Sequence, residues 1–217
     1  MATINRGILD GFFGKVGTVV GSFWKGIPVM RAYVRHIHDR KGAPQLLIRA
    51  RFATINGLAS SFLSAIRIGL RDAAAKSRTT EGNVFVKKNW GAVQASTVDS
   101  VTVDYADLLV AQGALTGVQF GTPSFDTPQR VAVGFDSNEE CEKTSLDDEV
   151  YVFVYCPDMK SGVLATPVKR SVKSISVMVP TCWNGMKVHV WGFTLGAGLD
   201  TLGEVSDSAY IGSGNIG

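Results

Sequence analysis

Side chains that can ligate metals stand closest together at His36 and His38, with Asp39 directly after them. Alternate residues of a strand point to one face, so the two imidazoles would meet only if this segment is extended. A zinc site needs three or four ligands, and no third ligand at a known spacing follows. Basic residues flank the pair, so we interpret the segment as a solvated connector that ends at Pro44.

A second group of ligand-type side chains lies between Asp136 and Glu149, where seven of the fourteen residues carry carboxylates. Calcium binds such oxygens, yet this spacing lacks the glycine and the terminal glutamate of the twelve-residue calcium loop. We expect either a solvated hairpin or a docking surface here. The acidic residues that we assign to a docking surface are Glu139, Glu140, Asp147 and Asp148.

Residues suited to nucleotide binding or catalysis do not form a known motif. The glycines between Gly11 and Gly21 resemble a phosphate-binding loop, but Lys15 is followed by valine instead of the Ser or Thr that the loop requires. His189 has no Ser or Cys nucleophile in a recognisable motif beside it, and the alternation along 187–193 predicts that it faces solvent or a neighbour. The sequence therefore predicts a non-enzymatic protein without catalytic, cofactor-binding or metal-binding residues.

The overall composition is that of a protein with a substantial core. The chain has 217 residues, 45% of them hydrophobic, which suffices for one large domain or two small ones. No apolar run is long enough to span a bilayer or to act as a secretory signal, so we expect a cytoplasmic protein without a membrane partner. Three cysteines at wide spacings predict reduced thiols, because an odd number fits neither a disulfide framework nor a zinc site.

Charge is distributed unevenly along the chain. Residues 1–78 contain 13 Lys and Arg against three Asp, a balance of +10, whereas residues 79–217 contain 9 basic and 16 acidic residues, a balance of −7. Such asymmetry indicates a basic segment that faces nucleic acid, or a contact between the basic half of one copy and the acidic half of the next. Two independently solvated surfaces are the third interpretation, since surface charges need no partner.

The first element is a glycine-rich arm over residues 11–33. Its sequence predicts strands at 16–20 and 27–33 around a turn at 21–26, and Pro28 predicts that the second strand lies at a sheet edge or begins there. A two-stranded ribbon alone is marginal in water, so its aromatic residues must pack against other protein. The arm residues that we assign to an assembly interface are Phe12, Phe13, Gly17, Gly21, Phe23 and Trp24.

A basic amphipathic helix follows from Pro44 to about Lys76, with apolar residues at steps of three and four. Gly57 and Gly69 inside it predict a close backbone approach, a bend or a split. Four residues separate Arg67 from Arg71, so their guanidiniums are neighbours that attract an anion, and we assign both to the assembly interface.

Beyond the break at 79–82, residues 83–94 fit a short helix, although their β-branched residues would also suit a strand. Short strand patterns then recur between loops rich in Pro, Gly, Asn and Asp, which is typical of an antiparallel sandwich. The segments with this pattern are 101–105, 108–111, 130–135, 150–155, 162–166, 174–179 and 187–193.

The glycine-rich stretch 14–28, with the sequence GKVGTVVGSFWKGIP, resembles the N-terminal signature of a family of uncharacterised Bacteroidota proteins of about this length. The likeness continues through 51–53, 104–105 with 109–110, and 205–212. The resemblance implies no activity and no catalytic residues, because none is assigned to that family.

Together these patterns predict a mainly β protein with an α-helical N-terminal segment. The expected domains are a glycine-rich β-arm and basic connector (1–42), a basic helical segment (43–98) and a fibronectin- or immunoglobulin-like sandwich (99–217). We expect a structural subunit that forms a homo-oligomer or joins other structural proteins, with a virion or other phage-derived particle as one setting. The alternative is a nucleic-acid-binding module that uses residues 31–78, although the acidic remainder would repel a long polyanion.

Overall fold

The computed structural model describes residues 3–4, 12–36, 39, 41–138, 144–198 and 202–217. It divides into two compact units, Met1–Gly42 and Ala43–Gly217.

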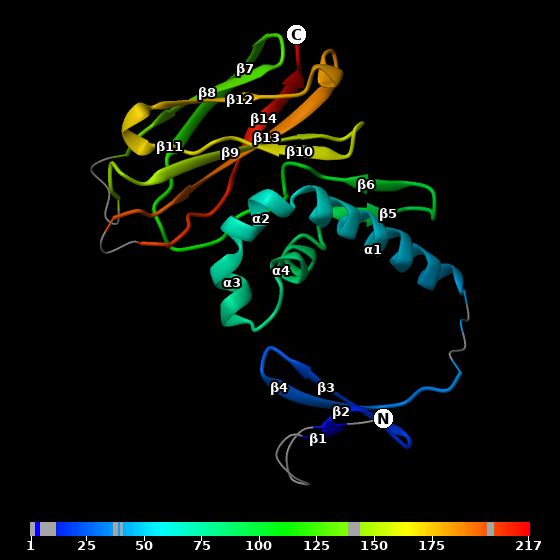
Figure 1. The fold of residues 1–217 in the computed structure, drawn as a ribbon. Helices are drawn as coiled ribbons and strands as arrows, with labels where there is room; N and C mark the ends of the chain where they lie inside the picture. Colours follow the sequence, from blue (N-terminus) through cyan, green and yellow to red (C-terminus); the bar gives the residue numbers. More distant parts are fainter. Residues whose placement is uncertain (1–2, 5–11, 37–38, 40, 139–143, 199–201) are drawn as a thin grey trace. The chain divides into compact units, whose positions relative to one another are not determined.

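The first unit is the β-arm, an antiparallel sheet in the order β1-β2-β3-β4 (Figure 1). Its strands are β1 (Thr3–Ile4), β2 (Phe12–Val16), β3 (Val19–Trp24) and β4 (Ile27–Ala32).

The turns of the arm differ from the sequence prediction. β3 runs straight through Gly21, and the expected turn at 21–26 shrinks to Lys25 and Gly26, whose φ angles are 45° and 79°. Two positive φ values in succession are what a two-residue type I′ hairpin turn requires. Gly17, with φ 57°, supplies the other turn, between β2 and β3. The expected edge position of Pro28 is confirmed, since β4 ends the strand order.

The second unit begins with helices, which are α1 (Ala43–Ser61), α2 (Leu63–Gly69), α3 (Arg71–Lys76) and α4 (Glu81–Lys88). The single helix expected from Pro44 to Lys76 is split, as its glycines allowed. The breaks fall at Phe62 and Leu70, and not at Gly57. A Cβ at Gly69 would lie 2.6 Å from Cβ of Ala111, so α2 ends where another segment of the chain approaches closely.

The short helix expected in 83–94 forms as α4, but it begins two residues earlier and ends at Lys88. Thr80 caps it by accepting a hydrogen bond from the backbone N–H of Asn83 at 3.3 Å.

Most expected strands are present. The strands of the second unit are β5 (Val93–Ala95), β6 (Val101–Val103), β7 (Gln119–Thr127), β8 (Arg130–Asp136), β9 (Glu149–Cys156), β10 (Ser161–Leu164), β11 (Val168–Lys169), β12 (Ser174–Met178), β13 (Lys187–Leu195) and β14 (Ala209–Asn215). The segment 108–111 is irregular instead of extended. The Asn89 side chain accepts a hydrogen bond from the N–H of Leu109 and donates one to its carbonyl, so this backbone needs no strand partner.

These elements form three layers (Figure 1). The central sheet has the order β10-β9-β13-β14, with β11 also paired to β9, and a second sheet has the order β12-β8-β7. β9 and β13 are buried on both faces of the central sheet. One face carries aromatic side chains and the other carries aliphatic ones. The aromatic face, covered by the helices, carries Tyr151, Phe153, Tyr155, Trp191 and Phe193. The aliphatic face, covered by the second sheet, carries Val150, Val152, Val154, Cys156, Val188 and Val190.

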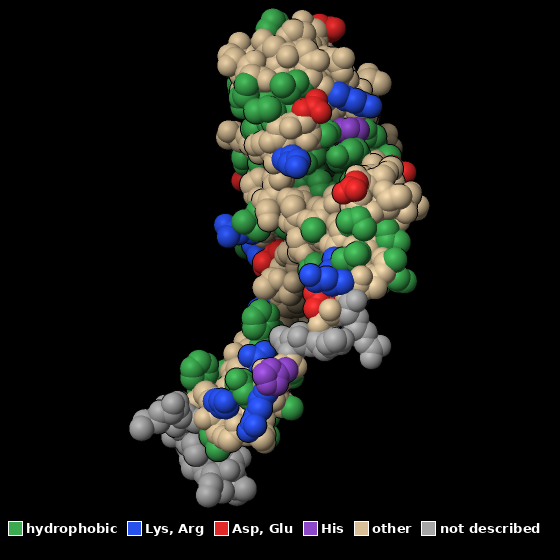
Figure 2. All heavy atoms as spheres, turned by 90° about the vertical axis from the view of Figure 1, so that its right-hand side faces the viewer, with side chains coloured by type: hydrophobic (Ala, Val, Ile, Leu, Met, Phe, Trp, Pro, Cys, Tyr) green, Lys and Arg blue, Asp and Glu red, His purple; other side chains and the backbone are tan. Residues whose placement is uncertain are grey.

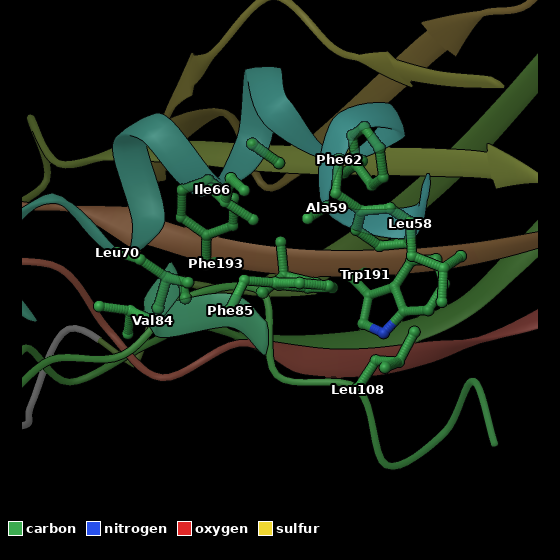
Figure 3. Packing of buried hydrophobic residues seen from close by; sticks show 14 of the residues in the cluster. Leu58, Ala59, Phe62, Ile66, Leu70, Val84, Phe85, Leu108, Trp191 and Phe193 are labelled. Atoms are coloured by element: carbon green, nitrogen blue, oxygen red, sulfur yellow. The ribbon is translucent and has the colours of Figure 1, made fainter. Parts of the chain in front are cut away.

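Phe62 joins the helices to the aromatic face (Figure 3). Its ring centroid lies 5.1 Å from that of Trp191, 4.7 Å from that of Phe153 and 5.6 Å from that of Phe85. Aromatic pairs at such separations add stabilisation beyond the burial of their area. The fold is thus mainly β, with several antiparallel sheets. It differs from a two-layer sandwich because helices cover the outer face of the central sheet.

Candidate assembly surface

The strand register divides the arm into two faces. Side chains directly opposite one another share a face, and side chains alternate along each strand. Val16 pairs with Val19, and Gly21 pairs with both Gly14 and Met30. One side of the sheet, here called the apolar face, therefore carries only apolar residues and glycines. They are Phe12, Gly14, Val16, Val19, Gly21, Phe23, Pro28, Met30 and Ala32.

Much of the apolar face is open to solvent. Val16 is 53% exposed, Phe23 43% and Met30 68%. Phe12 is half-buried because its ring lies over Gly21, where a Cβ would come within 2.7 Å of the ring. Exposed apolar side chains that adjoin one another mark interaction surfaces more often than scattered ones do.

The opposite side of the sheet, here called the mixed face, combines apolar and basic residues. It carries Phe13, Lys15, Val20, Ser22, Trp24, Ile27, Val29 and Arg31. The ammonium nitrogen of Lys15 lies 3.5 Å from the centre of the Tyr33 ring, a cation–π contact. Hydrophobic and basic side chains lie together on the described part of the arm (Figure 2).

The arm residues assigned from the sequence lie on both faces. Phe12 and Phe23 lie on the apolar face, and Phe13 and Trp24 on the mixed face, while Gly21 lies under Phe12 and Gly17 forms a turn. The sequence assignment missed Val16 and Met30. Their place on the apolar face follows from the strand register. The sequence prediction had the wrong register because it placed a turn at 21–26.

The two assigned arginines differ in their surroundings. Arg67 is exposed on α2. Arg71 donates a hydrogen bond to the carbonyl of Gly203 at 3.1 Å and lies 3.4 Å from a carboxylate oxygen of Asp72. Arg71 thus already has partners within its own chain.

The acidic residues differ likewise. Glu139 and Glu140 lie outside the described residues. Asp147 is exposed and forms an ion pair of 2.8 Å with Lys169. Asp148, which we expected on a docking surface, is instead completely buried. It lies 3.2 Å from the equally buried guanidinium of Arg170 and accepts hydrogen bonds from the N–H groups of Ser145 and Ala197.

The expected orientation of His189 toward solvent is wrong. The imidazole is buried on the helix side of β13, stacks on the Tyr105 ring with centroids 4.2 Å apart, and lies 2.9 Å from the hydroxyl of Tyr210. Burial, with a smaller contribution from the charge of Lys187, lowers the pKa of His189 to about 4. Because helices cover this sheet face, the alternation along β13 separates two buried faces rather than a buried one from a wet one.

Neither a metal-binding cluster nor a membrane-crossing helix occurs among the described residues. Within those ranges, no three His, Cys, Asp or Glu side chains come together in a way that could hold a metal ion. Of the helices described, none combines the length and apolar character that crossing a membrane requires. Cys156 and Cys182 are free thiols, the first buried and the second exposed, while Cys141 lies outside the described residues.

These features define a β-rich protein made of an apolar β-arm and a larger unit of three layers. The chain belongs to the family of unknown function DUF6266, whose model matches residues 11–212. The match includes most of the arm as well as nearly all of the second unit. No curated protein and no solved structure matches the chain.

Proposed function

We propose that the protein is a non-enzymatic structural subunit that assembles with copies of itself through its β-arm. In this proposal the arm adds strands to the sheet edge of a neighbouring subunit. The observation that carries the proposal is the apolar face of the arm. Its residues from β2, β3 and β4 include no polar side chain, and large residues such as Met30 are exposed on it. A small sheet of this kind is stable when another body of protein covers it.

The edge strand of the arm supports strand addition as the mode of contact. β4 ends the order of the arm sheet, and its side chains are all exposed. An exposed edge presents backbone groups that pair with another sheet, and alternating side chains then supply specificity. Pro28 withholds one donor near the start of β4, so the pairing would use the later part of the strand.

Charge favours the second unit of a neighbouring copy, instead of another arm, as the partner. Residues 1–42 contain seven Lys and Arg against two Asp, so two arms would repel one another. Residues 79–217 have an excess of seven acidic residues and would attract the arm. Such a contact is head-to-tail and propagates from subunit to subunit unless the rotation closes a ring.

The second proposed contact joins the basic helices to the acidic segment of a neighbour. Arg67 on one subunit and Asp147 on the other remain candidates because both are exposed, and Asp147 would exchange its ion pair with Lys169 for the contact with the neighbour. Arg71 is a weaker candidate because it also bonds to the backbone of Gly203, and Asp148 because it is completely buried. An exposed ion pair contributes orientation more than affinity.

The proposed setting is an assembled particle, such as a virion or a phage-derived particle, formed after cytoplasmic synthesis. We also propose that the relatives are Bacteroidota proteins which share the glycine signature at 14–28. The two packed sheets of the second unit would then be a fibronectin- or immunoglobulin-like module elaborated by a helical layer.

A cross-linking experiment tests the partner directly. The full chain is made with the photo-cross-linking residue p-benzoylphenylalanine in place of Phe23, and equal amounts of ¹⁴N- and ¹⁵N-labelled protein are mixed before irradiation. The proposal predicts mixed-isotope peptides that join β4 or β3 to residues 79–217. Cross-links confined to single-isotope peptides would mean that the arm packs on its own chain and would contradict the proposal.

The nucleic-acid alternative is tested with the same preparation. Some of the basic residues in 31–78 serve the fold, since Arg51 stacks on the Trp90 ring at 4.1 Å and Arg71 bonds to Gly203. A gel shift with duplex and single-stranded oligonucleotides at moderate salt is expected to show no complex. A stable complex at that salt would favour the alternative.

A further inference from the structure

A cleft of about 960 Å³ lies in the second unit. It lies between α3, α4 and two loops at 112–114 and 204–207. Its charged lining residues are Asp72, Lys76, Lys87, Lys88, Glu204 and Asp207. Here it is called the lysine cleft.

The three lysines come from the last turns of α3 and α4. Across the described ranges, no carboxylate lies within ion-pair distance of Lys76, Lys87 or Lys88. The helix dipole stabilises positive charges in the last turn of a helix. This accounts for lysines at the ends of α3 and α4, but not for the fact that all three line one cleft.

The carboxylates of the cleft are already engaged within the chain. Asp72 pairs with Arg71 at 3.4 Å, and Asp207 accepts the backbone N–H of Gly113 at 3.1 Å. Glu204 also interacts within the chain. The three lysines that line the cleft are therefore available to an anionic ligand, whereas each of its acidic residues already has an interaction within the chain.

We propose that the lysine cleft binds an acidic segment of a polypeptide. The cleft is much larger than a single carboxylate or phosphate needs, and its volume falls at the upper end of the usual range for ligand sites. Asn83, Gln112 and Thr79 line it as well and can hydrogen-bond to peptide groups. Lysine suits carboxylates that approach from several directions, because its charge is compact and its stem flexible.

The acidic residues in the lining argue for a peptide over a nucleic acid. A nucleic acid presents phosphate groups all along its backbone, so part of it would face Glu204 and Asp207. A peptide can direct its acidic side chains to the lysines and place uncharged residues beside the carboxylates, because its backbone carries no charge. The proposal is independent of the arm, since every residue of the cleft lies in the second unit.

Fluorescence anisotropy of a fluorescein-labelled hexaglutamate peptide, titrated with the full-length protein at low salt, tests the proposal. The triple variant K76Q/K87Q/K88Q keeps most of each side-chain stem and is expected to bind about tenfold more weakly, because it removes three exposed charges that each contribute modestly to binding. The matched control K41Q/K160Q/K187Q changes the net charge equally at exposed positions outside the cleft and should bind as the wild type does. Circular dichroism verifies that both variants are folded.

Four results would overturn the proposal. The first is no binding of hexaglutamate by the wild type, and the second is an equal loss in the control variant, which would mean attraction by net charge alone. The third comes from competition: displacement of the peptide by an oligothymidylate at lower concentration than by unlabelled hexaglutamate would identify a nucleic-acid site. The fourth also comes from competition. Inorganic phosphate is expected to displace the labelled peptide only weakly, and displacement as strong as that by unlabelled hexaglutamate would mean that the cleft binds small anions and not a peptide.

Discussion

The ring of Phe12 lies on Gly21 at the centre of the arm, so closely that a methyl group at position 21 would come within 2.7 Å of the ring. The same methyl group would collide with the carbonyl oxygen of Phe12. Glycine is therefore required at this position for β2 and β3 to pair with Phe12 folded over the apolar face.

The substitution Gly21→Ala tests this relationship. We expect β2 to separate from β3, because neither a backbone oxygen nor the attached ring can move aside without breaking the pairing. Hydrogen exchange read by mass spectrometry should show faster exchange in residues 12–32 and unchanged exchange in the central strands β9 and β13. Ser22→Ala, one residue along on the mixed face, is the control and should leave exchange as it is. Unaltered protection in Gly21→Ala would show that the arm does not hold this geometry.

Two helix glycines predict opposite effects of the same substitution. Alanine at Gly57 would meet no atom within 4 Å, so Gly57→Ala should raise the free energy of unfolding by up to about 1 kcal/mol through helix propensity. Alanine at Gly69 would press on Ala111 and on the carbonyl oxygen of Val110, which lies 2.7 Å from the added Cβ. Gly69→Ala should therefore lower that free energy by about 1–3 kcal/mol. Urea denaturation compares the two variants, and equal effects would contradict the packing of α2.

The buried pair of Asp148 and Arg170 predicts a large loss of stability when one partner is removed. Arg170 also donates hydrogen bonds to the carbonyls of Ser137 and Thr116, so Asp148→Ala leaves a fixed, buried guanidinium without its counter-charge. The expected loss is about 3–5 kcal/mol in the free energy of unfolding. Asp147→Ala is the control, because its ion pair with Lys169 is exposed and should matter little. A similar small effect of both substitutions would argue against burial of Asp148.

His189 predicts a specific dependence of stability on pH. Its pKa is about 4 in the folded protein, against an ordinary value near 6.5 in the unfolded chain. Between these values the unfolded state binds the extra proton, so His189 makes stability fall as the pH falls from about 6.5 to about 4.

Thermal unfolding midpoints of the wild type and of His189→Phe, measured across that window, test the effect. Phenylalanine preserves the stacking on Tyr105 but cannot bind a proton, so its midpoint should fall less steeply toward low pH. His36→Gln removes an exposed imidazole and should follow the wild type. Parallel curves for wild type and His189→Phe would mean that the imidazole titrates normally and is not buried.

The periodic parts of the fold could be predicted from sequence, and the parts set by tertiary contacts could not. Steps of three and four between apolar residues identified the helical segment, and runs such as 150–155 identified strands. The breaks at Phe62 and Leu70 depend on packing against distant residues such as Ala111, which no local pattern contains. β14 was missed because its glycines and serine lack alternating apolar residues.

The assembly surface was predicted in part for the same reason. Aromatic and glycine residues marked the arm, yet assigning its residues to faces required the register, and the turn at Lys25–Gly26 was hidden by the earlier glycine at 21. The burial of His189 and Asp148 was missed because both are polar and lie in segments that look solvated. Their partners, Tyr210 and Arg170, are far enough along the chain that only the folded structure joins them.

The mass of the protein in solution, measured by size-exclusion chromatography with light scattering over a range of concentrations at low salt, tests assembly through the arm most directly. Met30→Glu places a charge on the apolar face, whereas Met159→Glu places the same charge on an exposed site of the second unit. We predict that the wild type and Met159→Glu form oligomers whose mass grows with concentration, and that Met30→Glu remains a monomer. A wild type that stays monomeric at every concentration, or a Met30→Glu variant that assembles as the wild type does, would contradict the account.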